Sequence, residues 1–239
     1  MTRARISVIT FDLDDTLWDV RPVLLEAERR LQLWLGEHAR GVPEVLADGG
    51  AQALRTQLVG ADPSLAHQLS RLRTAVLHAA TLRAGYREPH ATVLAGQAFE
   101  VFLAARQEVT LFDGVGALLQ SLGQQYRLGA LSNGNADLKR LACGALFDFH
   151  FSAETVGAAK PHPALFHAAF AHTRVTADEV LHVGDSAEHD VLGAQRAGVR
   201  SVWVNVSGNP FPADAARPTA EVRSVLELPE VLRVLNAAG

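Results

Sequence analysis

Hydrophobic and polar positions change their spacing twice along this chain of 239 residues. Residues 6–11 form a short run rich in β-branched side chains that ends in acidic residues, which predicts a buried strand. From residue 21 to about 106, leucine and valine recur at helical spacing, interrupted by glycine or proline near residues 41–43, 49–50, 62–63 and 88–89. This stretch predicts about four helices and no strand.

After residue 111 the pattern alternates between helical segments and short apolar runs. Helices are expected at 115–122, 136–142, 163–172 and 187–197, and strands at 126–131, 149–151, 180–183 and 201–204. Strands that alternate with helices predict a parallel sheet covered on both faces, with right-handed crossovers. The fold class expected is therefore α/β, a Rossmann-like doubly wound parallel sheet. Residues 1–16 and 110–239 would form this core, and residues 17–109 a helical insertion of four-helix type.

Composition and charge exclude several classes of function. The 22 basic and 26 acidic side chains give a net charge of −4, with no basic run to favour nucleic acid or a membrane surface. Cys143, the one cysteine, permits no internal disulfide and no cysteine-rich zinc site. With no apolar run of membrane-spanning length and no signal-peptide pattern at the start, we expect a cytoplasmic protein. Only Lys139 and Lys160 of the 22 basic residues are lysines.

Asp12 and Asp14 directly follow the predicted first strand. Side chains two positions apart on an extended segment share a face, so the two carboxylates point the same way. They repel each other and favour a hard divalent cation, and Mg²⁺ typically takes one or two carboxylates beside a substrate phosphate. An isolated pair of this kind is equally compatible with a solvated acidic turn that ends in a helix cap at Asp15 or Thr16.

Three other strand ends carry polar residues, and in an open parallel sheet ligands bind beyond the carboxyl ends of the strands. Ser132 and Asn133 precede an expected helix, where a hydroxyl and free backbone N–H groups can hold an anion, although they also suit an ordinary turn. Lys160 stands beside prolines that stiffen its backbone, or is a plain surface lysine. Asp185 follows Gly184 at the exit of a strand, and Asp190 lies early in the next helix, where the helix dipole also favours a carboxylate.

Taken together, in this order and all at strand ends, these motifs resemble those of the haloacid dehalogenase-like superfamily of phosphohydrolases. The matching segments are Asp12-Leu13-Asp14-Asp15-Thr16, Ser132-Asn133, Lys160, and Gly184-Asp185 through Asp190. The resemblance spans nearly the whole chain, because the helical insertion is similar to that family's first-type cap domain.

The resemblance implies an enzyme that hydrolyses phosphomonoesters through an aspartyl phosphate, with Mg²⁺ as cofactor and a small phosphorylated metabolite as substrate. Asp12 would be the nucleophile and Asp14 the general acid and base. Phosphate would be held by Ser132, the backbone at Asn133, and Lys160. Metal ligands would be Asp12, the Asp14 carbonyl and Asp185, with Asp190 and Thr16 in support. Electrostatics independently favours cations at this site. Two unit charges about 4 Å apart at an effective dielectric of ~20 interact by roughly 4 kcal/mol, so a carboxylate that approaches a phosphate needs positive charge nearby.

Several alternatives remain on the same fold. The namesake dehalogenases resemble this chain but lack an acid at the position of Asp14, which favours a phosphatase. A phosphorylatable receiver module is about half this length and lacks the second aspartate. A non-catalytic binding protein would be expected to lose a key residue, and a phosphomutase would differ only in excluding water.

The substrate is predicted from a narrower resemblance. Residues 10–21, 132–136 and 181–185 are similar to a bacterial subgroup that acts on FMN and on the phosphorylated ribitylaminouracil of riboflavin biosynthesis. Nucleotide, sugar-phosphate and phosphoglycolate phosphatases share the same core and stay open as alternatives.

Residues near the motifs have their own expectations. Trp18 would stack on a planar leaving group or pack in the hinge, and Arg21 would meet a second anion or lie in a solvated first helical turn. Trp34 is expected in the core of the helical insertion, and Asp113 is expected to cap the helix that starts at Val115. Three histidines close to the motifs form no zinc constellation and are interpreted as bystanders: His162, His182 and His189.

Overall fold

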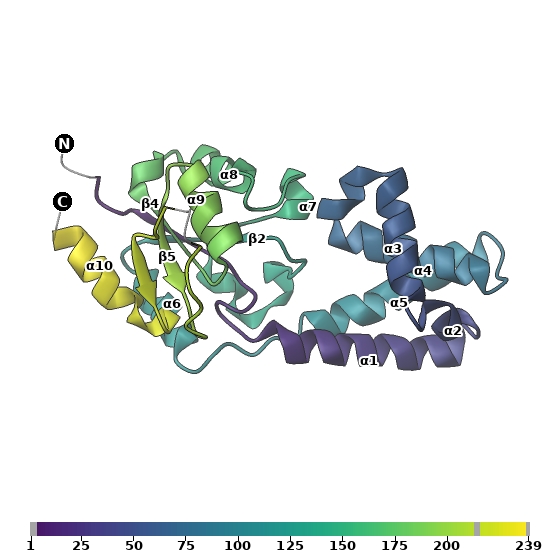
Figure 1. The fold of residues 1–239 in the computed structure, drawn as a ribbon. Coiled ribbons are helices and arrows are strands. Elements are labelled where there is room, and N and C mark those ends of the chain that lie inside the picture. Colours follow the sequence, from purple (N-terminus) through teal and green to yellow (C-terminus); the bar gives the residue numbers. More distant parts are fainter. Residues whose placement is uncertain (1–3, 213–215, 238–239) are drawn as a thin grey trace. The chain divides into compact units, whose positions relative to one another are not determined.

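A computed structural model describes residues 4–212 and 216–237 of the chain. It divides into two compact units (Figure 1). One unit contains Met1–Asp19 and Thr110–Gly239, and the other is the helical segment Val20–Val109. We refer to them as the sheet unit and the helical unit.

The sheet unit is built on one parallel sheet. Its strands are β1 (Val8–Phe11), β2 (Arg127–Ser132), β3 (Phe149–Ser152), β4 (Val180–Gly184), β5 (Arg200–Val204) and β6 (Ala220–Val222). They lie in the order β3-β2-β1-β4-β5-β6, with every pairing parallel. The predicted fold class is confirmed. Strand β6 was not predicted from the sequence, because three residues are too few to show an alternating pattern of apolar and polar positions. The strand order reverses direction on either side of β1, which is where an open α/β sheet binds its ligand.

Helices cover this sheet by burying apolar faces against it. The longer ones are α6 (Val115–Leu122), α8 (Ala164–Thr173) and α10 (Leu228–Ala237), and two single turns are α7 (Ala153–Val156) and α9 (Gly193–Arg196). Helix α8 buries Leu165 and Phe166 against Val8 and Leu131 of the sheet in one core cluster. Fully burying a side chain of this size contributes about 1.5–3 kcal/mol, so this cluster anchors the strands whose ends form the site.

Two helix predictions in this unit need correction. Residues 136–142 form no α-helix but two short 3₁₀ turns, Leu138–Arg140 and Ala142–Leu146. The Asp137 side chain accepts from the backbone N–H of Lys139, which caps a tight turn, and Gly144 lies so close to the Leu138 carbonyl that a Cβ would clash at 1.8 Å. The predicted helix 187–197 begins as a π-helical turn, Ala187–Leu192, and continues as α9.

The cap assigned to Asp113 is also wrong. Gly114 occupies the N-cap position of α6, with φ of 81° and no side-chain cap hydrogen bond. A left-handed backbone at that position favours glycine, so the chain turns into α6 without a carboxylate cap.

The helical unit contains α1 (Val20–His38), α2 (Val42–Leu46), α3 (Gly50–Ala61), α4 (Leu69–Arg83) and α5 (His90–Arg106), with a 3₁₀ turn at Pro63–His67. Four of these are the expected long helices, and α2 is an additional short one. Helix α5 packs along both α1 and α4 around a shared apolar core. Trp34 packs against this core, as predicted, and stacks on His38. Among the helices of the described residues, none is long and apolar enough to cross a bilayer.

Candidate active site

The site lies at the carboxyl ends of β1, β2 and β4. The backbone N–H of Asp12 donates to the Val183 carbonyl at 2.8 Å, so the β1–β4 pairing continues past the end of β1 and brings Asp12 beside the exit of β4. A cavity of about 290 Å³ opens here. Its walls are made by Asp12, Asp14, Ser132, Asn133, Gly134, Lys160, Asp185, Ser186, His189 and Asp190. All four motifs therefore reach one cavity of the sheet unit.

Lys160 is buried beneath this cavity and holds the nucleophile candidate. Its Nζ lies 2.6 Å from Asp12 Oδ1, 2.6 Å from Asp190 Oδ1 and 2.5 Å from the Leu131 carbonyl oxygen. These three acceptors use all three donors of an ammonium group. Burial opposes the charge of Lys160, but the carboxylates of Asp12 and Asp190 outweigh it and raise the pKa of Lys160. The interpretation of Lys160 as a surface lysine is wrong, since only 2% of it is exposed.

Asn133 positions Lys160 through its side chain. The Asn133 Oδ1 accepts from the backbone N–H of Lys160 at 2.7 Å, and its Nδ2 donates to the Lys160 carbonyl at 2.9 Å. The amide is therefore bonded to the backbone of the lysine through both its oxygen and its nitrogen, which fixes the orientation of the Asn133 side chain. Ser132 lines the same cavity, with its Oγ accepting from Gly134 N–H at 2.9 Å and its own hydrogen able to donate.

Asp14 is held by the turn that follows β1. The indole N–H of Trp18 donates to Asp14 Oδ1 at 2.8 Å, and Trp18 is fully buried. Trp18 therefore packs inside the protein, and the expectation that it stacks on a leaving group is wrong. Thr16 is buried as well and donates to Asp185 Oδ1 at 3.3 Å. Arg21 lies exposed in the first turn of α1, which agrees with the solvated alternative.

His182 is no bystander. Its Nε2 lies 3.1 Å from Asp190 Oδ1, its Nδ1 lies 2.9 Å from Thr10 Oγ1, and all three residues are buried. A neutral imidazole with its hydrogen on Nε2 satisfies both partners, because it donates to the carboxylate and accepts from the hydroxyl. Burial lowers the pKa of His182, which keeps the ring neutral. The other two histidines, His162 and His189, are exposed.

Asp190 supports Lys160 from behind. Its Oδ1 accepts from Lys160 and His182, and its Oδ2 accepts from the backbone N–H of Ser186 at 2.9 Å. Burial alone would raise the pKa of Asp190, but the charge of Lys160 and the hydrogen bonds from Lys160 and His182 outweigh burial and lower it. Gly184 makes room for it, since a Cβ at this position would lie 2.2 Å from Asp190 Cγ. That close approach, rather than a tight exit from the strand, explains the glycine.

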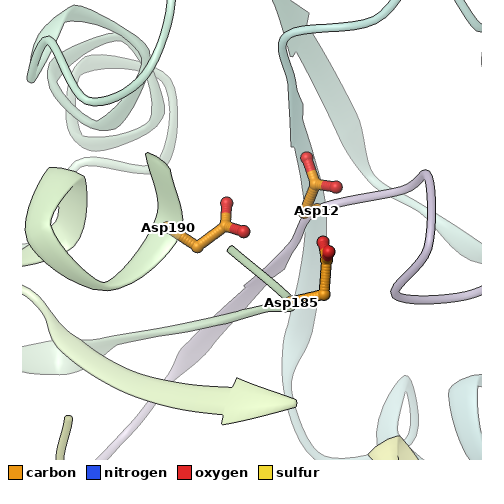
Figure 2. Close-up of side chains that lie close together, drawn as sticks. All are labelled: Asp12, Asp185 and Asp190. Carbon is orange, nitrogen blue, oxygen red and sulfur yellow. The ribbon is translucent and has the colours of Figure 1, made fainter. Parts of the chain in front are cut away.

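A cluster of carboxylates in this cavity can hold a cation. Oxygens of Asp12, Asp185 and Asp190 lie within 4.8 Å of one another (Figure 2). Because both oxygens of Asp190 are already bonded to protein donors, Asp12 and Asp185 are the pair left to face an ion. Burial, followed by the charges of Asp190 and Asp15, raises the pKa of Asp185 to about 6, and burial raises the pKa of Asp12 although Lys160 opposes it. Two crowded carboxylates with hard oxygen donors fit a divalent cation.

The sequence matches a known family over most of its length. Residues 6–198 match the haloacid dehalogenase-like hydrolases, and that span contains every motif residue described above. The chain belongs to this family of hydrolases. It is an enzyme of that family, so the predicted membership and enzyme class are confirmed.

Relatives of this haloacid dehalogenase-like hydrolase carry two kinds of activity in their names. The 5-amino-6-(5-phospho-D-ribitylamino)uracil phosphatase YigB of Escherichia coli is 32% identical over 200 residues, 84% of each chain. Human N-acylneuraminate-9-phosphatase is 28% identical over 247 residues, 99% of this chain and 97% of that one. The crystal structure of a 2-haloacid dehalogenase from Pseudomonas syringae pv. Tomato has a TM-score of 0.92 at 41% identity, covering 96% of this chain and 99% of that one.

The hydrogen-bond partners of the motif residues were missed by sequence reasoning. Thr10 and His182 are polar positions inside two otherwise apolar strands, and they are register partners across β1 and β4. Their polarity was the available signal, since a buried polar side chain is normally hydrogen-bonded. Trp203, whose indole N–H donates to the Asp185 carbonyl at 2.7 Å, carried no such signal because tryptophan also suits a plain core.

Proposed function

We propose that this hydrolase is a Mg²⁺-dependent phosphomonoesterase that acts through an aspartyl-phosphate intermediate on Asp12. One observation carries the proposal: Asp14, a second carboxylate, lines the same cavity as the Asp12–Lys160 pair and is anchored by Trp18. A dehalogenase needs a nucleophile, but the leaving halide needs no proton. A phosphatase needs an acid for its leaving alkoxide, and in this proposal Asp14 supplies it.

In the proposed reaction Asp12 attacks phosphorus, and the bond from phosphorus to the ester oxygen breaks. Asp14 gives its proton to that oxygen. Water then attacks the aspartyl phosphate, Asp14 takes the water proton, and inorganic phosphate leaves with Asp12 restored. Ser132, the backbone N–H of Asn133 and the charge of Lys160 would stabilise phosphate oxygens.

A divalent cation held by Asp12, the Asp14 carbonyl and Asp185 would offset the repulsion between the nucleophile and the phosphate. The residues fit it, since Asp12 and Asp185 offer hard oxygens within 4.8 Å of each other, and burial with nearby carboxylates raises the pKa of Asp185. Lys160 also offsets the charge of Asp12, since its Nζ lies 2.6 Å from Asp12 Oδ1.

The leading substrate hypothesis is FMN or a riboflavin-pathway ribityl phosphate. The similarity to E. coli YigB over 84% of each chain supports it. Nucleotides, sugar phosphates and phosphoglycolate are the alternatives, and E. coli pyrimidine 5′-nucleotidase YjjG, 33% identical over 144 residues, supports the first of them. We propose further that the helical unit acts as the cap that recognises the leaving group.

The test is a phosphate-release screen with Mg²⁺ over FMN, ribitylaminouracil phosphate, nucleotides and sugar phosphates. We expect release that requires the metal, is abolished in Asp12→Asn, and leaves that variant folded as judged by circular dichroism. Wild-type turnover that survives EDTA would contradict the metal requirement. Brisk turnover of a nucleotide or sugar phosphate beside inert FMN and ribityl phosphate would overturn the substrate hypothesis, and an isomeric ester in place of free phosphate would identify a phosphomutase.

A 2-haloacid dehalogenase is the second candidate, because the Pseudomonas syringae protein of that name is 41% identical with a TM-score of 0.92. The same purified enzyme should therefore be offered a 2-chloro acid with a halide-sensitive readout. Halide release without phosphate release would replace the phosphatase proposal with this one.

A further inference from the structure

We propose that Trp18 is a positioning residue for Asp14: its indole N–H holds Oδ1, so that Oδ2 is the oxygen that exchanges the proton with the leaving group. The inference rests on the proposed function, since it concerns the step in which Asp14 acts as an acid. Its basis is the 2.8 Å contact from Trp18 Nε1 to Asp14 Oδ1.

The indole is held rigidly. Trp18 is fully buried, and its carbonyl accepts from the Asp15 N–H at 2.8 Å, which closes the turn between Asp14 and Trp18. The neighbouring Leu17 is held by two backbone hydrogen bonds. Its N–H donates to the Leu13 carbonyl at 2.9 Å, and its carbonyl accepts from the Phe112 N–H at 2.9 Å. A ring fixed by its backbone and its packing defines one position for the carboxylate that it bonds.

The chemistry of indole then distinguishes the two oxygens of Asp14. An indole N–H only donates, and in a neutral carboxylic acid the carbonyl oxygen accepts a hydrogen bond more strongly than the hydroxyl oxygen does. The 2.8 Å contact therefore favours the carbonyl form at Oδ1 and the proton at Oδ2. In the first half-reaction the Oδ2–H bond breaks and its proton goes to the ester oxygen as the phosphorus–oxygen bond breaks. In the second, Oδ2 takes a proton from the attacking water.

The location of the ring agrees with this role. Asp14 is among the residues that line the cavity, and Trp18 is not. The indole thus contacts the carboxylate from the protein side, where it orients the acid without touching the substrate.

The test compares kcat/KM for a series of phosphomonoesters in wild type and Trp18→Phe. This ratio reports the first half-reaction, in which a poor leaving group needs the proton of Asp14 and a good one does not. General acid catalysis contributes about 10²–10⁴-fold to the rate. We expect Trp18→Phe to lower kcat/KM by about 10-fold or more with alkyl phosphates. With p-nitrophenyl phosphate the decrease should be at most about 3-fold, because this leaving group needs little help from an acid. Asp14→Ala should show the same selective loss, larger in size.

Trp34→Phe is the matched control, because it removes an indole from the core of the helical unit. It should lower all substrates equally or not at all. Adding Trp18→Phe to Asp14→Ala should cause no further change in leaving-group dependence, because the two residues act through one contact.

A second measurement does not depend on Trp18→Phe being folded, because it keeps the tryptophan and changes Asp14. The chain has three tryptophans, so wild type has three indole N–H resonances to assign. Asp14→Ala should shift that of Trp18 upfield and leave that of Trp34 in place.

The outcomes separate cleanly. Two results would overturn the positioning role while the phosphatase proposal stands. One is an equal decrease in kcat/KM for all leaving groups in Trp18→Phe. The other is a Trp18 indole resonance that does not shift in Asp14→Ala. Wild-type protein with no Asp12-dependent phosphate release would overturn both.

Discussion

The imidazole of His182 bonds the carboxylate of Asp190 at 3.1 Å in the fully buried core of the sheet unit. Thr10 holds the other ring nitrogen at 2.9 Å, and Asp190 in turn bonds Lys160 at 2.6 Å. A chain of hydrogen bonds therefore runs from β1 through β4 to the lysine beneath Asp12. Buried networks of this kind hold their shape when every member is satisfied and are costly to break.

Replacing His182 with phenylalanine should destabilise the fold and misplace the lysine. The substitution roughly keeps the ring volume, but the Thr10 hydroxyl loses its ring partner and Asp190 loses one hydrogen bond. A buried unsatisfied group costs about 1–3 kcal/mol. We expect the free energy of unfolding to fall by about 2 kcal/mol in urea titrations, with a drop in kcat. Adding Thr10→Val should recover part of the loss, because it removes the orphaned hydroxyl. Strictly additive losses would show that the Thr10–His182 bond contributes nothing.

Asn133→Ala should impair catalysis more than stability. Its side chain makes two bonds to the backbone of Lys160, at 2.7 and 2.9 Å, so its loss lets the lysine drift from Asp12. Small displacements in such sites can cost up to about 10²-fold, and we expect at least about 10-fold in kcat with a small change in melting temperature. The exposed Asn236, bonded to Tyr126, gives a control in Asn236→Ala. Full activity in Asn133→Ala would refute this positioning.

The two lysines of the chain should respond differently to arginine. Lys160 is buried with three acceptors at 2.5–2.6 Å around one nitrogen, a geometry that an extended guanidinium cannot reproduce. Lys139 is exposed in a 3₁₀ turn. Lys160→Arg should therefore cripple phosphate release, while Lys139→Arg stays near wild type. Similar activities in the two purified, folded variants would contradict this difference.

Stabilisation by Mg²⁺ should depend on pH through Asp185. Without a cation, burial and nearby carboxylates raise the pKa of Asp185 from 3.8 to about 6. Because the folded protein binds this proton more tightly than the unfolded chain does, protonation of Asp185 stabilises the metal-free fold at a pH below the pKa of the unfolded chain. This stabilisation is lost as the pH rises through 6. A cation competes with this proton, so the rise in melting temperature on adding Mg²⁺ should be larger at about pH 7.5 than at about pH 5.

Asp185→Asn is the control for that titration, since it removes the charge but keeps the shape. It should show little stabilisation by Mg²⁺ at either pH. An equal gain for wild type at both values would mean that the proton on Asp185 does not compete with the ion.

Much of the architecture follows from local patterns. The alternation of apolar runs and helical segments is enough to predict a parallel sheet, and helix 115–122 begins and ends as expected. The predictions failed where short-range chemistry competes with periodicity. Asp137 and Gly144 turn a predicted helix into two 3₁₀ turns, and the three residues of β6 are too short to show a period.

Apolar runs in the sequence are enough to predict that Asp12, Ser132 and Asp185 stand at or beyond strand ends, since each follows a run that must be buried. Lys160 was expected at such an end too, but it follows the helical turn α7 and reaches the site through a loop. The sequence could not determine which side chains hold these residues. Thr10 and His182 are 172 positions apart, and only the register of β1 on β4 makes them partners. Trp18 is close to Asp14 in the chain, yet its direction depends on the turn between them. Periodicity specifies the face on which a side chain lies, whereas tertiary packing decides what it meets there.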